Sequence, residues 1–440
     1  MKKFFGVFGN PISHSKSPII YNTFFKKFDL KECYYTRIFA SDSEEVVLLS
    51  KKMKLSGVNI TSPFKKDITK FCDKLDYGVQ QTDSANTLYF ADEQIISYNT
   101  DIFGIQEEIF KANVDFGEKK IAIIGAGGAA ATIIYVIQNL FKDADITIFN
   151  RTTQNAKNLS HKFNVKFIEN EEKSFENLQQ FDIVFVAIPQ FNNFLKNIKF
   201  KKNAILFIAN YSDKNTILHF QQEYNKVIPC YNWLFYQAIK SFQIFFNNHK
   251  INLRNDDMKD ILQELPKSLS KNNIYLSGFS GSGKTTIAPI LSEKLKVNYV
   301  DLDKMIESEL NMSIEKIFSK YGENYFRNKE SQYLEKIAFD KEKKIVALGA
   351  GALDNDKNRN LIRRTGYNIY LYSDLETCLQ RIDLATRPVL CDMKEKEASI
   401  LFDKRFENYF FSSDLVFSNS ADNGIERRIN QLFFEIKQTI

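Results

Sequence analysis

Residues 278–285 combine glycines, a lysine and a threonine in the spacing that binds a phosphate chain. Their sequence, GFSGSGKT, matches the pattern G-x-x-x-x-G-K-[ST]. In this pattern backbone N–H groups surround the phosphates, the lysine reaches the transferred phosphoryl group and the hydroxyl binds Mg²⁺. The segment therefore predicts an ATP site with magnesium, made by Gly278, Gly281, Ser282, Gly283, Lys284, Thr285 and Thr286.

A second glycine-rich turn, GAGGAA at residues 125–130, indicates a dinucleotide. It lies between an apolar run and a helical pattern, where a pyrophosphate meets the N-terminus of a helix. After the next expected strand the chain has Arg151 where an NAD-binding turn has an acidic residue, and arginine suits a 2′-phosphate. We therefore expect NADP(H), bound by Gly125, Ala126, Gly127, Gly128, Ala129, Asn150, Arg151 and Thr152.

Strands of parallel sheets must position these two turns. Short apolar runs at 121–127, 182–189 and 204–210 have the length of buried strands and alternate with helical patterns. A fresh apolar run at 274–277 leads into the lysine-containing turn. The pattern predicts the α/β class, with one parallel sheet behind each turn.

The length of the chain favours several domains. At about 150 residues per domain, 440 residues correspond to about three. We expect an α/β domain at 1–103 completed by a helix at 233–252, a Rossmann-like domain at 104–232, and a P-loop domain with a parallel sheet at 273–440. The polar residues 253–272, which include Pro266, are expected to form a linker.

Composition excludes several classes of protein. The formal net charge of +6 is spread along the chain, which fits phosphate-bearing small ligands at least as well as nucleic acid. Because the sequence has no basic stripe, we expect no nucleic-acid partner. No apolar run approaches the roughly 18 residues of a membrane span, and Asn10 and Pro11 interrupt the apolar start before a secretory segment forms. Five scattered cysteines indicate neither a zinc site nor a disulfide framework. We expect a cytoplasmic protein that has no membrane partner.

Five ordered motifs carry a resemblance to a known family. The segments GNPISHSKSPIIYN, SGVNITSPFKKD, SANTL and YNTDIFG, followed by GAGGAA with NRT, resemble shikimate dehydrogenase over residues 1–265. The resemblance implies that the first domain binds 3-dehydroshikimate and shikimate. It places the substrate carboxylate at Ser15 and Ser17, and the rest of the substrate at Asn59, Thr61, Lys65, Asn86, Asp101, Tyr211 and Gln237.

The chemistry of Lys65 and Asp101 agrees with this resemblance. Reduction of a ring ketone needs a proton at the developing alkoxide, and a lysine paired with a carboxylate can deliver it. Two segments depart from the family: AIPQ at 187–190 replaces a threonine-containing turn, and CYNWL at 230–234 replaces a glycine-rich one. We therefore expect the cofactor pocket to differ from that of the family.

The C-terminal part resembles a second family. The segments NYVDLDKMIE, SIEKIF, GENYFRNKES, GAGAL, ATRPVL and RFENY are similar to shikimate kinase, in order, over residues 273–440. The resemblance implies catalysis by Lys284 and Asp303, a magnesium ligand at Asp301, and a lid over ATP that contains Arg387. It assigns substrate binding to Asp303, Arg327, Gly349, Gly351 and Arg405. Ala350 stands where the family has the middle of three glycines, so turnover is expected to be slower.

Together the two resemblances predict a bifunctional enzyme. The first part would reduce 3-dehydroshikimate with NADPH, and the second would phosphorylate the resulting shikimate with ATP, two successive steps towards chorismate and the aromatic amino acids. One alternative is a quinate or shikimate dehydrogenase fused to a kinase of a different polyol. Another is a C-terminal module that senses nucleotide without turnover.

Overall fold

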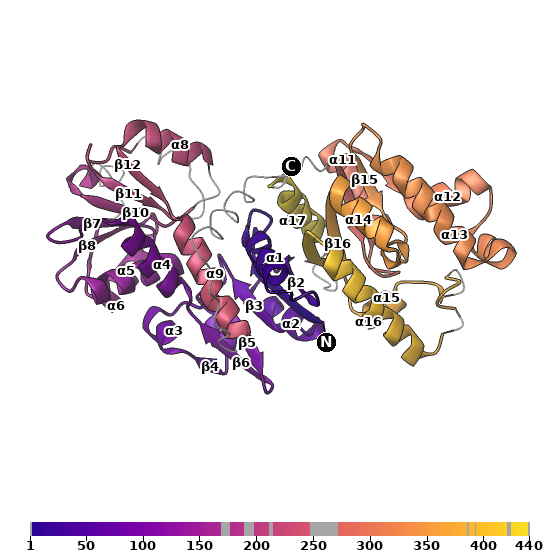
Figure 1. Cartoon of the computed structure of the whole chain (residues 1–440), viewed down its shortest axis with the longest axis horizontal. Coiled ribbons are helices and arrows are strands. Elements are labelled where there is room, and N and C mark those ends of the chain that lie inside the picture. Colours follow the sequence, from indigo (N-terminus) through magenta and orange to yellow (C-terminus); the bar gives the residue numbers. More distant parts are fainter. Residues whose placement is uncertain are drawn as a thin grey trace. The chain divides into compact units, whose positions relative to one another are not determined.

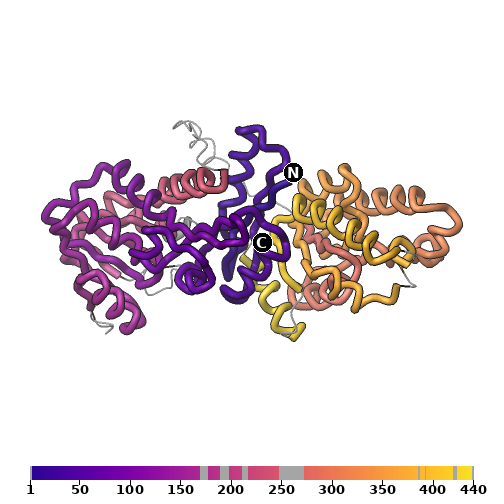
Figure 2. Tube along the Cα trace, turned by 90° about the horizontal axis from the view of Figure 1, so that it is seen from below, coloured from indigo at the N-terminus to yellow at the C-terminus, as the bar shows by residue number. Residues whose placement is uncertain are grey.

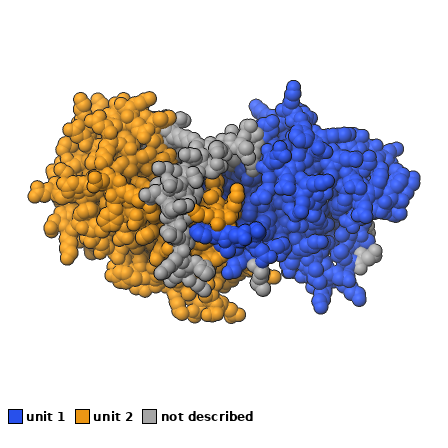
Figure 3. Space-filling view, viewed as in Figure 1, with its two compact units in different colours: residues 1–18, 28–41, 264–440 blue, residues 19–27, 42–263 orange. Residues whose placement is uncertain are grey.

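The computed structural model describes residues 2–168, 177–188, 198–210, 214–246, 272–384, 387–391, 393–419 and 424–438. Contacts within the chain divide it into two compact units, coloured separately in Figure 3. Unit 1 contains residues 1–18, 28–41 and 264–440, and unit 2 contains residues 19–27 and 42–263. Each unit is described by itself. The expected domain limits at 103 and 232 stay predictions, and the expected linker at 253–272 lies outside the described residues except for its last position.

Unit 2 contains a six-stranded sheet in the order β12-β11-β10-β7-β8-β9, with every pair parallel (Figure 1). Its central strands are apolar because helices cover both faces of the sheet. This is the Rossmann-like α/β architecture that the apolar runs predicted. The strands are β7 (Lys120–Ile124), β8 (Asp145–Phe149), β9 (Lys166–Ile168), β10 (Ile183–Val186), β11 (Ile205–Ile208) and β12 (Lys226–Pro229). The helices are α4 (Asp101–Ala112), α5 (Gly128–Leu140), α6 (Thr153–Phe163), α8 (Lys214–Glu223) and α9 (Tyr231–Phe245).

A smaller group of strands in unit 2 follows the order β3-β5-β6-β4. The β3–β5 and β5–β6 pairs are antiparallel, and β4 pairs with β6 in parallel. The strands are β3 (Gly57–Ile60), β4 (Lys74–Leu75), β5 (Thr87–Ala91) and β6 (Gln94–Tyr98). The accompanying helices are α1 (Ser17–Lys27), which begins in unit 1, α2 (Ser43–Lys52), η1 (Asp67–Phe71) and α3 (Tyr77–Thr82).

Helices α4 and α9 pack closely along each other (Figure 1). A Cβ atom on Gly104 of α4 would lie 2.6 Å from the carbonyl oxygen of Trp233 in α9, so only glycine permits this approach. Glu108 then caps α9, because its carboxylate accepts from the backbone N–H of Trp233 at 2.9 Å. The helix expected at 233–252 is confirmed over its described part, although it begins at Tyr231.

Unit 1 is built on a parallel sheet in the order β14-β15-β13-β16-β17-β2-β1. The strands are β1 (Lys3–Gly9), β2 (Cys33–Phe39), β13 (Asn273–Ser277), β14 (Asn298–Asp301), β15 (Lys344–Ala347), β16 (Gly366–Tyr372) and β17 (Leu415–Ser418). The helices are α11 (Lys284–Leu295), α12 (Leu302–Leu310), α13 (Ile314–Ala338), η3 (Ala352–Asp354), α14 (Asp356–Thr365), α15 (Leu375–Gln380), α16 (Glu395–Ser412) and α17 (Ile425–Lys437). The parallel sheet expected behind the lysine-containing turn is therefore present.

The first two strands of the chain extend this sheet, which the sequence did not predict. Strand β2 pairs with β17 in parallel, with Arg37 opposite Leu415 and Phe39 opposite Phe417. The rings of Phe39 and Phe417 stack at 4.9 Å, and Phe4 of β1 contacts the rings of α16 residues edge to face. Figure 2 shows the indigo start of the trace beside its yellow end. The edge of β17 is thus covered by the N-terminal segment.

The span of α13 consists of two helical segments that meet at a kink at Gly322, where φ is 79° and ψ is 166°. Charged side chains occur along its whole length. Across the ranges that the structure describes, no helix combines the length and the apolar content that crossing a membrane requires.

The core beside the six-stranded sheet depends on stacked phenylalanines. Phe116 is 1% exposed and stacks on Phe141 with ring centroids 4.7 Å apart and an interplanar angle of 6°. Phe185 and Phe207 stack in the same cluster at 4.4 Å. Close packing of large rings makes this cluster sensitive to any loss of volume.

Replacing Phe116 with alanine is expected to destabilise unit 2 by about 3–5 kcal/mol, because it leaves a cavity among these rings. Phe110→Ala is the matched control, since Phe110 is 61% exposed, and its effect should stay within roughly 0.5 kcal/mol. The single tryptophan of the chain, Trp233, belongs to unit 2, so its fluorescence in a urea titration reports this unit. Equal midpoints for the two variants would contradict the assigned core.

Candidate active sites

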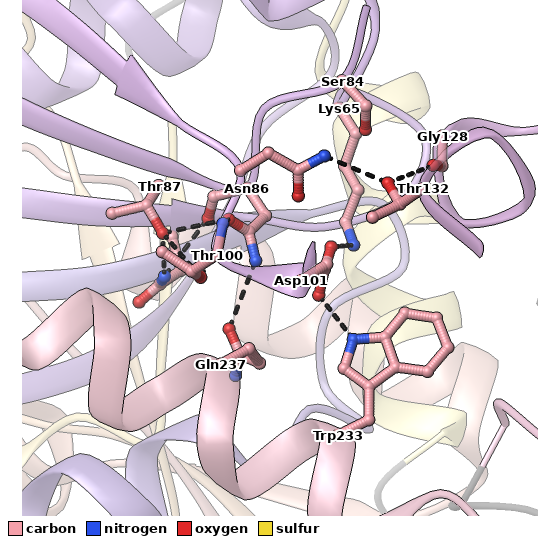
Figure 4. Close-up of polar contacts among 12 residues, drawn as sticks. Lys65, Ser84, Asn86, Thr87, Thr100, Asp101, Gly128, Thr132, Trp233 and Gln237 are labelled. Atoms are coloured by element: carbon pink, nitrogen blue, oxygen red, sulfur yellow. Dashed lines mark hydrogen bonds and ion pairs between the residues drawn. The ribbon is translucent and has the colours of Figure 1, made fainter. Parts of the chain in front are cut away.

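An ion pair between Lys65 and Asp101 lies at the centre of the candidate site in unit 2 (Figure 4). The Nζ atom of Lys65 lies 2.6 Å from Oδ2 of Asp101, and the two side chains are 19% and 5% exposed. Asp101 is the first residue of α4, where the positive end of the helix dipole favours a carboxylate. Its other oxygen, Oδ1, accepts a hydrogen bond from the indole N–H of Trp233 at 2.8 Å. Both oxygens of the carboxylate are therefore held.

A buried polar network adjoins this pair. Asn59 of β3 donates to the hydroxyls of Thr87 and Ser241 at 3.0 Å each, and Asn86 donates to Oε1 of Gln237 at 3.3 Å. Residues of β3, β5, α4 and α9 thus present amide and hydroxyl groups together, as Figure 4 shows for those it labels. Hydroxyl-rich substrates need such paired donors and acceptors. The structure therefore brings together Asn59, Lys65, Asn86, Asp101 and Gln237, all of which the resemblance singled out.

The other four predicted substrate residues are not among these contacts. Ser15 and Ser17 belong to unit 1, where both are buried and their hydroxyl oxygens lie 3.3 Å apart. Thr61 is half-buried directly after β3. Tyr211 lies outside the described residues, so its predicted role stays a prediction.

The turn after β7 has the backbone features of a dinucleotide-binding turn. Gly125 has a φ of +126°, and a Cβ atom there would lie 2.6 Å from the carbonyl oxygen of Ala187, so this position requires glycine. A Cβ atom on Gly127 would have no neighbour within 4 Å, so the N-terminus of α5 is open at this point. No side chain caps that terminus, since Gly127 is its N-cap residue. Open N–H groups at the end of a helix fit a pyrophosphate.

The residues expected to contact the adenosine end follow β8. Asn150 donates to the carbonyl oxygen of Thr152 at 2.9 Å, which shapes the turn into α6, and Arg151 and Thr152 are exposed. An exposed guanidinium beside a turn is accessible to a 2′-phosphate. Of the departing segment at 187–190, Ala187 and Ile188 contact the glycine turn, whereas residues 189 and 190 lie outside the described residues.

In unit 1 the lysine-containing turn follows β13. Gly278, Gly281 and Gly283 all have positive φ, at 147°, 82° and 98°. Lys284 is buried, and its Nζ donates to the carbonyl oxygens of Gly278 and Phe279 at 2.8 Å each. Burial lowers the pKa of Lys284 to about 8, which the charge of Asp303 partly opposes. The hydroxyl of Ser282 is buried without a hydrogen-bond partner among the described residues, which fits a missing phosphate oxygen.

Thr285 and Asp301 meet beside this turn. The Thr285 hydroxyl donates to Oδ2 of Asp301 at 2.9 Å, and Asp301 caps the N-terminus of α12. Hydroxyl and carboxylate oxygens are ligands that suit Mg²⁺, which keeps several waters and binds through substrate phosphates. The two predicted metal ligands are therefore brought together. Thr286 follows in the first turn of α11, where its N–H donates to the carbonyl oxygen of Gly283.

A cluster of charged groups surrounds the GAG turn that follows β15. Arg327 donates to Glu330 at 2.9 Å, and Glu330 is 1% exposed. A Cβ atom on Gly349 would lie 2.2 Å from Oε1 of Glu330 and 2.7 Å from Oδ1 of Asp303. A Cβ atom on Gly351 would lie 2.3 Å from Nη2 of Arg327. The two glycines therefore let the three charged side chains approach the backbone of this turn.

Burial changes the proton affinity of the two acids in this cluster. It raises the pKa of Asp303, and the nearby charge of Asp301 adds to the effect. Burial likewise raises the pKa of Glu330 to about 7, although the charge of Arg327 opposes the shift. The pKa of Glu330 therefore lies near neutral pH, and Glu330 contacts Arg327, which is predicted to bind the substrate.

Two further arginines, Arg405 and Arg387, were also singled out by the resemblance. Arg405 is buried and donates to Oδ2 of Asp354 at 3.1 Å. Arg387 is close enough to act electrostatically on Lys284 and Asp303, and its Nε atom is buried without a hydrogen-bond partner in the described part of the chain. An unpartnered buried guanidinium nitrogen fits an anionic ligand.

Ala350 does not have a left-handed backbone conformation, and its carbonyl accepts from the Tyr409 hydroxyl.

Sequence reasoning missed several residues of the two sites. Glu330 lies three positions after Arg327 on one helix, so the spacing alone indicated an ion pair. Trp233 and Ser241 gave no such signal, because α9 brings them to partners more than 100 positions earlier in the chain. Asp354, the partner of Arg405, likewise becomes a neighbour only through folding.

Comparison with known proteins agrees with the geometry of the first site. Family models match residues 7–88 as "Shikimate dehydrogenase substrate binding domain" and residues 106–207 as "Shikimate / quinate 5-dehydrogenase". Shikimate dehydrogenase (NADP(+)) of Methanococcus maripaludis is 31% identical over 261 residues, which cover 55% of this chain and 91% of that protein. Two other shikimate dehydrogenases match at 38% and 35% identity, and the chain spans 62% and 56% of their lengths.

A solved structure of shikimate dehydrogenase in complex with NADP⁺ has a TM-score of 0.51 and 26% identity, covering 60% of this chain and 96% of that one. For the C-terminal part, a family model for "Shikimate kinase" matches residues 280–439. Shikimate kinase of Clostridium beijerinckii is 32% identical over 170 residues, which cover 39% of this chain and 95% of that protein. The chain therefore belongs to two families at once, shikimate dehydrogenase in its N-terminal part and shikimate kinase in its C-terminal part.

Proposed function

We propose that the N-terminal part reduces 3-dehydroshikimate to shikimate with NADPH. The observation that supports this most directly is the place of Lys65. A Cβ atom on Gly128, at the start of α5, would lie 3.4 Å from Cβ of Lys65, so the Lys65–Asp101 pair adjoins the dinucleotide turn. A proton donor beside a cofactor turn is the arrangement that reduction of a ketone requires.

Each residue of the pair has a separate task. NADPH, when bound, supplies a hydride to the carbonyl carbon of the substrate. Lys65 donates a proton from Nζ to the carbonyl oxygen as negative charge develops there. Asp101 orients Lys65 through Oδ2, while Trp233 holds Oδ1. Asn59, Thr61, Asn86, Tyr211 and Gln237 would orient the ring hydroxyls, and Ser15 and Ser17 would bind the carboxylate.

For the C-terminal part we propose phosphorylation of shikimate with ATP and Mg²⁺. Residues 278–286 would hold the phosphates, Arg387 would cover them, and Thr285 with Asp301 would hold the metal ion. Asp303 would accept the hydrogen bond, and then the proton, of the attacking hydroxyl. Arg327 and Arg405 would hold the substrate carboxylate, and Gly349 and Gly351 would let the backbone approach it.

The product of the first reaction is the substrate of the second, which gives the fusion a functional reason. We also propose a cytoplasmic location. The proposed partners are small molecules alone, because the modest charge excess of the sequence forms no basic stripe for nucleic acid. The limits at 103, 232 and 272 are proposed as domain boundaries.

Crossed variants test both assignments in the full-length chain. Lys65→Ala is expected to lower kcat for NADPH-dependent reduction roughly 10²–10⁴-fold, the range of a positioned acid or base, and to leave shikimate phosphorylation unchanged. Asp303→Asn is expected to lower kcat for shikimate phosphorylation over the same range and to leave the reduction unchanged. The control Lys66→Ala alters an exposed neighbour and should change neither rate. Parallel loss of both activities in one variant would overturn the assignment to separate sites. If the parent chain makes no shikimate 3-phosphate, the kinase assignment fails and the C-terminal part is instead a nucleotide sensor.

Trp233→Phe removes the indole N–H that holds Asp101 and keeps an aromatic ring. Loss of one hydrogen bond to a carboxylate corresponds to roughly 10- to 100-fold, so kcat/KM for 3-dehydroshikimate is expected to fall about tenfold or more. Phosphorylation of shikimate by the same variant should stay unchanged, because Lys284 and Asp303 belong to unit 1. An unchanged kcat/KM would mean that Lys65 alone orients Asp101.

The pKa of Glu330 predicts a pH dependence of shikimate binding. Below a pH of about 7 its carboxyl is neutral, and Arg327 is available to the substrate carboxylate; above that pH the ionised Glu330 competes for Arg327. The KM for shikimate in the kinase reaction is therefore expected to rise between pH 6 and pH 8 in the parent chain and to stay flat in Glu330→Gln. Glu323→Gln is the control, because this exposed carboxylate also contacts Arg327. A flat profile in the parent would contradict the raised pKa.

A further inference from the structure

The last helix of the chain inserts a buried carboxylate beside the loop that follows β1. Glu435 of α17 is 0% exposed. Its oxygens accept hydrogen bonds from the backbone N–H of Ile12 at 3.0 and 3.1 Å and from that of Ser13 at 2.8 Å. A glutamate is rarely buried unless such bonds compensate for lost hydration. The contact therefore joins Glu435 to Ile12, two residues that are 423 positions apart in the sequence.

The loop that Glu435 holds contains the serines expected to bind the substrate carboxylate. The carbonyl oxygen of Ile12 accepts from the N–H of Ser15 at 2.9 Å, so one turn links the Glu435 contact to Ser15. The Ser15 hydroxyl in turn donates to that of Ser17. A displacement of the peptide at Ile12 would therefore move the serine pair.

A second bridge joins the same loop to the C-terminal sequence. Arg37 of β2 donates through Nε to the carbonyl oxygen of Ser15 at 2.9 Å and through Nη1 to the carbonyl oxygen of Asp414 at 3.2 Å. Arg37 lies where β2 pairs with β17, opposite Leu415. The loop is thus linked to the kinase family region at two points, through the Glu435 carboxylate at Ile12 and Ser13 and through the Arg37 guanidinium at Ser15.

We propose that Glu435 is a positioning residue for the dehydrogenase reaction, so that the kinase part of the chain sets the affinity of the reductase part for its substrate. This inference rests on the proposed function, in particular on the role of Ser15 and Ser17. It goes beyond that function because a residue of the last kinase helix governs reduction without touching substrate. A loop that must hold a carboxylate loses binding when its geometry shifts by about 1 Å.

The test compares Glu435→Ala, Glu435→Gln and the control Glu426→Gln in the full-length chain. Glu426 is an exposed glutamate on the same helix. Glu435→Ala is expected to raise KM for 3-dehydroshikimate by about 10- to 100-fold, the effect of losing a charged acceptor. KM for NADPH and the kcat of the kinase reaction should stay within about threefold. Glu435→Gln keeps the size and one acceptor oxygen, so it should show an intermediate KM, whereas Glu426→Gln should match the parent.

The outcomes separate this inference from the function on which it rests. If the parent reduces no 3-dehydroshikimate, the proposed function fails. If the parent is active and Ser15→Ala raises KM while Glu435→Ala and Glu435→Gln do not, the inference alone is wrong. If Glu435→Ala does not fold, Glu435→Gln decides: an increase in KM for 3-dehydroshikimate alone supports a positioning role. An equal fall in reduction and phosphorylation in Glu435→Gln would show a general structural role and overturn the proposal.

Discussion

A charged side chain can be buried only where other groups balance it, and both proposed sites follow from this constraint. Asp101 is almost fully buried because Lys65 and Trp233 occupy its two oxygens. Lys284 is buried because two carbonyl oxygens of its own turn accept its protons. Glu330 depends on Arg327 in the same way, with a pKa that burial moves to about 7. These groups are held before any substrate binds, so the proposed chemistry needs little reorganisation.

The two nucleotide turns use one structural device for different ligands. In each unit a buried parallel strand, β7 or β13, ends at a glycine of positive φ and leads into the N-terminus of a helix. The ends of parallel strands leave this space open, which is why ligands collect there. The turn after β7 offers backbone groups and free space at Gly127, which suits a pyrophosphate. The turn after β13 adds Lys284, Thr285 and the adjacent Asp301, which suit a phosphoryl group that must be transferred with a metal ion.

Strand pairing between β2 and β17 gives the fusion a physical consequence. The unpaired edge of a sheet invites association, and here a strand from the start of the chain covers it. The same pairing brings Arg37 and the loop at Ile12 against the last kinase elements, where Glu435 completes their hydrogen bonds. Two enzymes in one chain would need only a tether to share an intermediate. This sheet instead makes residues 28–41 and 264–440 parts of one compact unit.

The sequence by itself determined the α/β class and the two glycine turns, because these depend on local patterns. Its resemblance to the two families proposed most of the other residues of both sites. Apolar runs predict buried strands, and glycines with a lysine predict a phosphate turn wherever the chain places them. Only the tertiary structure decided that Trp233 holds Asp101 and that Glu435 holds the loop at Ile12, since these partners are 132 and 423 positions apart. It also decided that β2 joins β17. The physical reason is that an apolar strand pattern states that a strand is buried but not which strand lies beside it, and a lone tryptophan or glutamate has no local feature that names its partner.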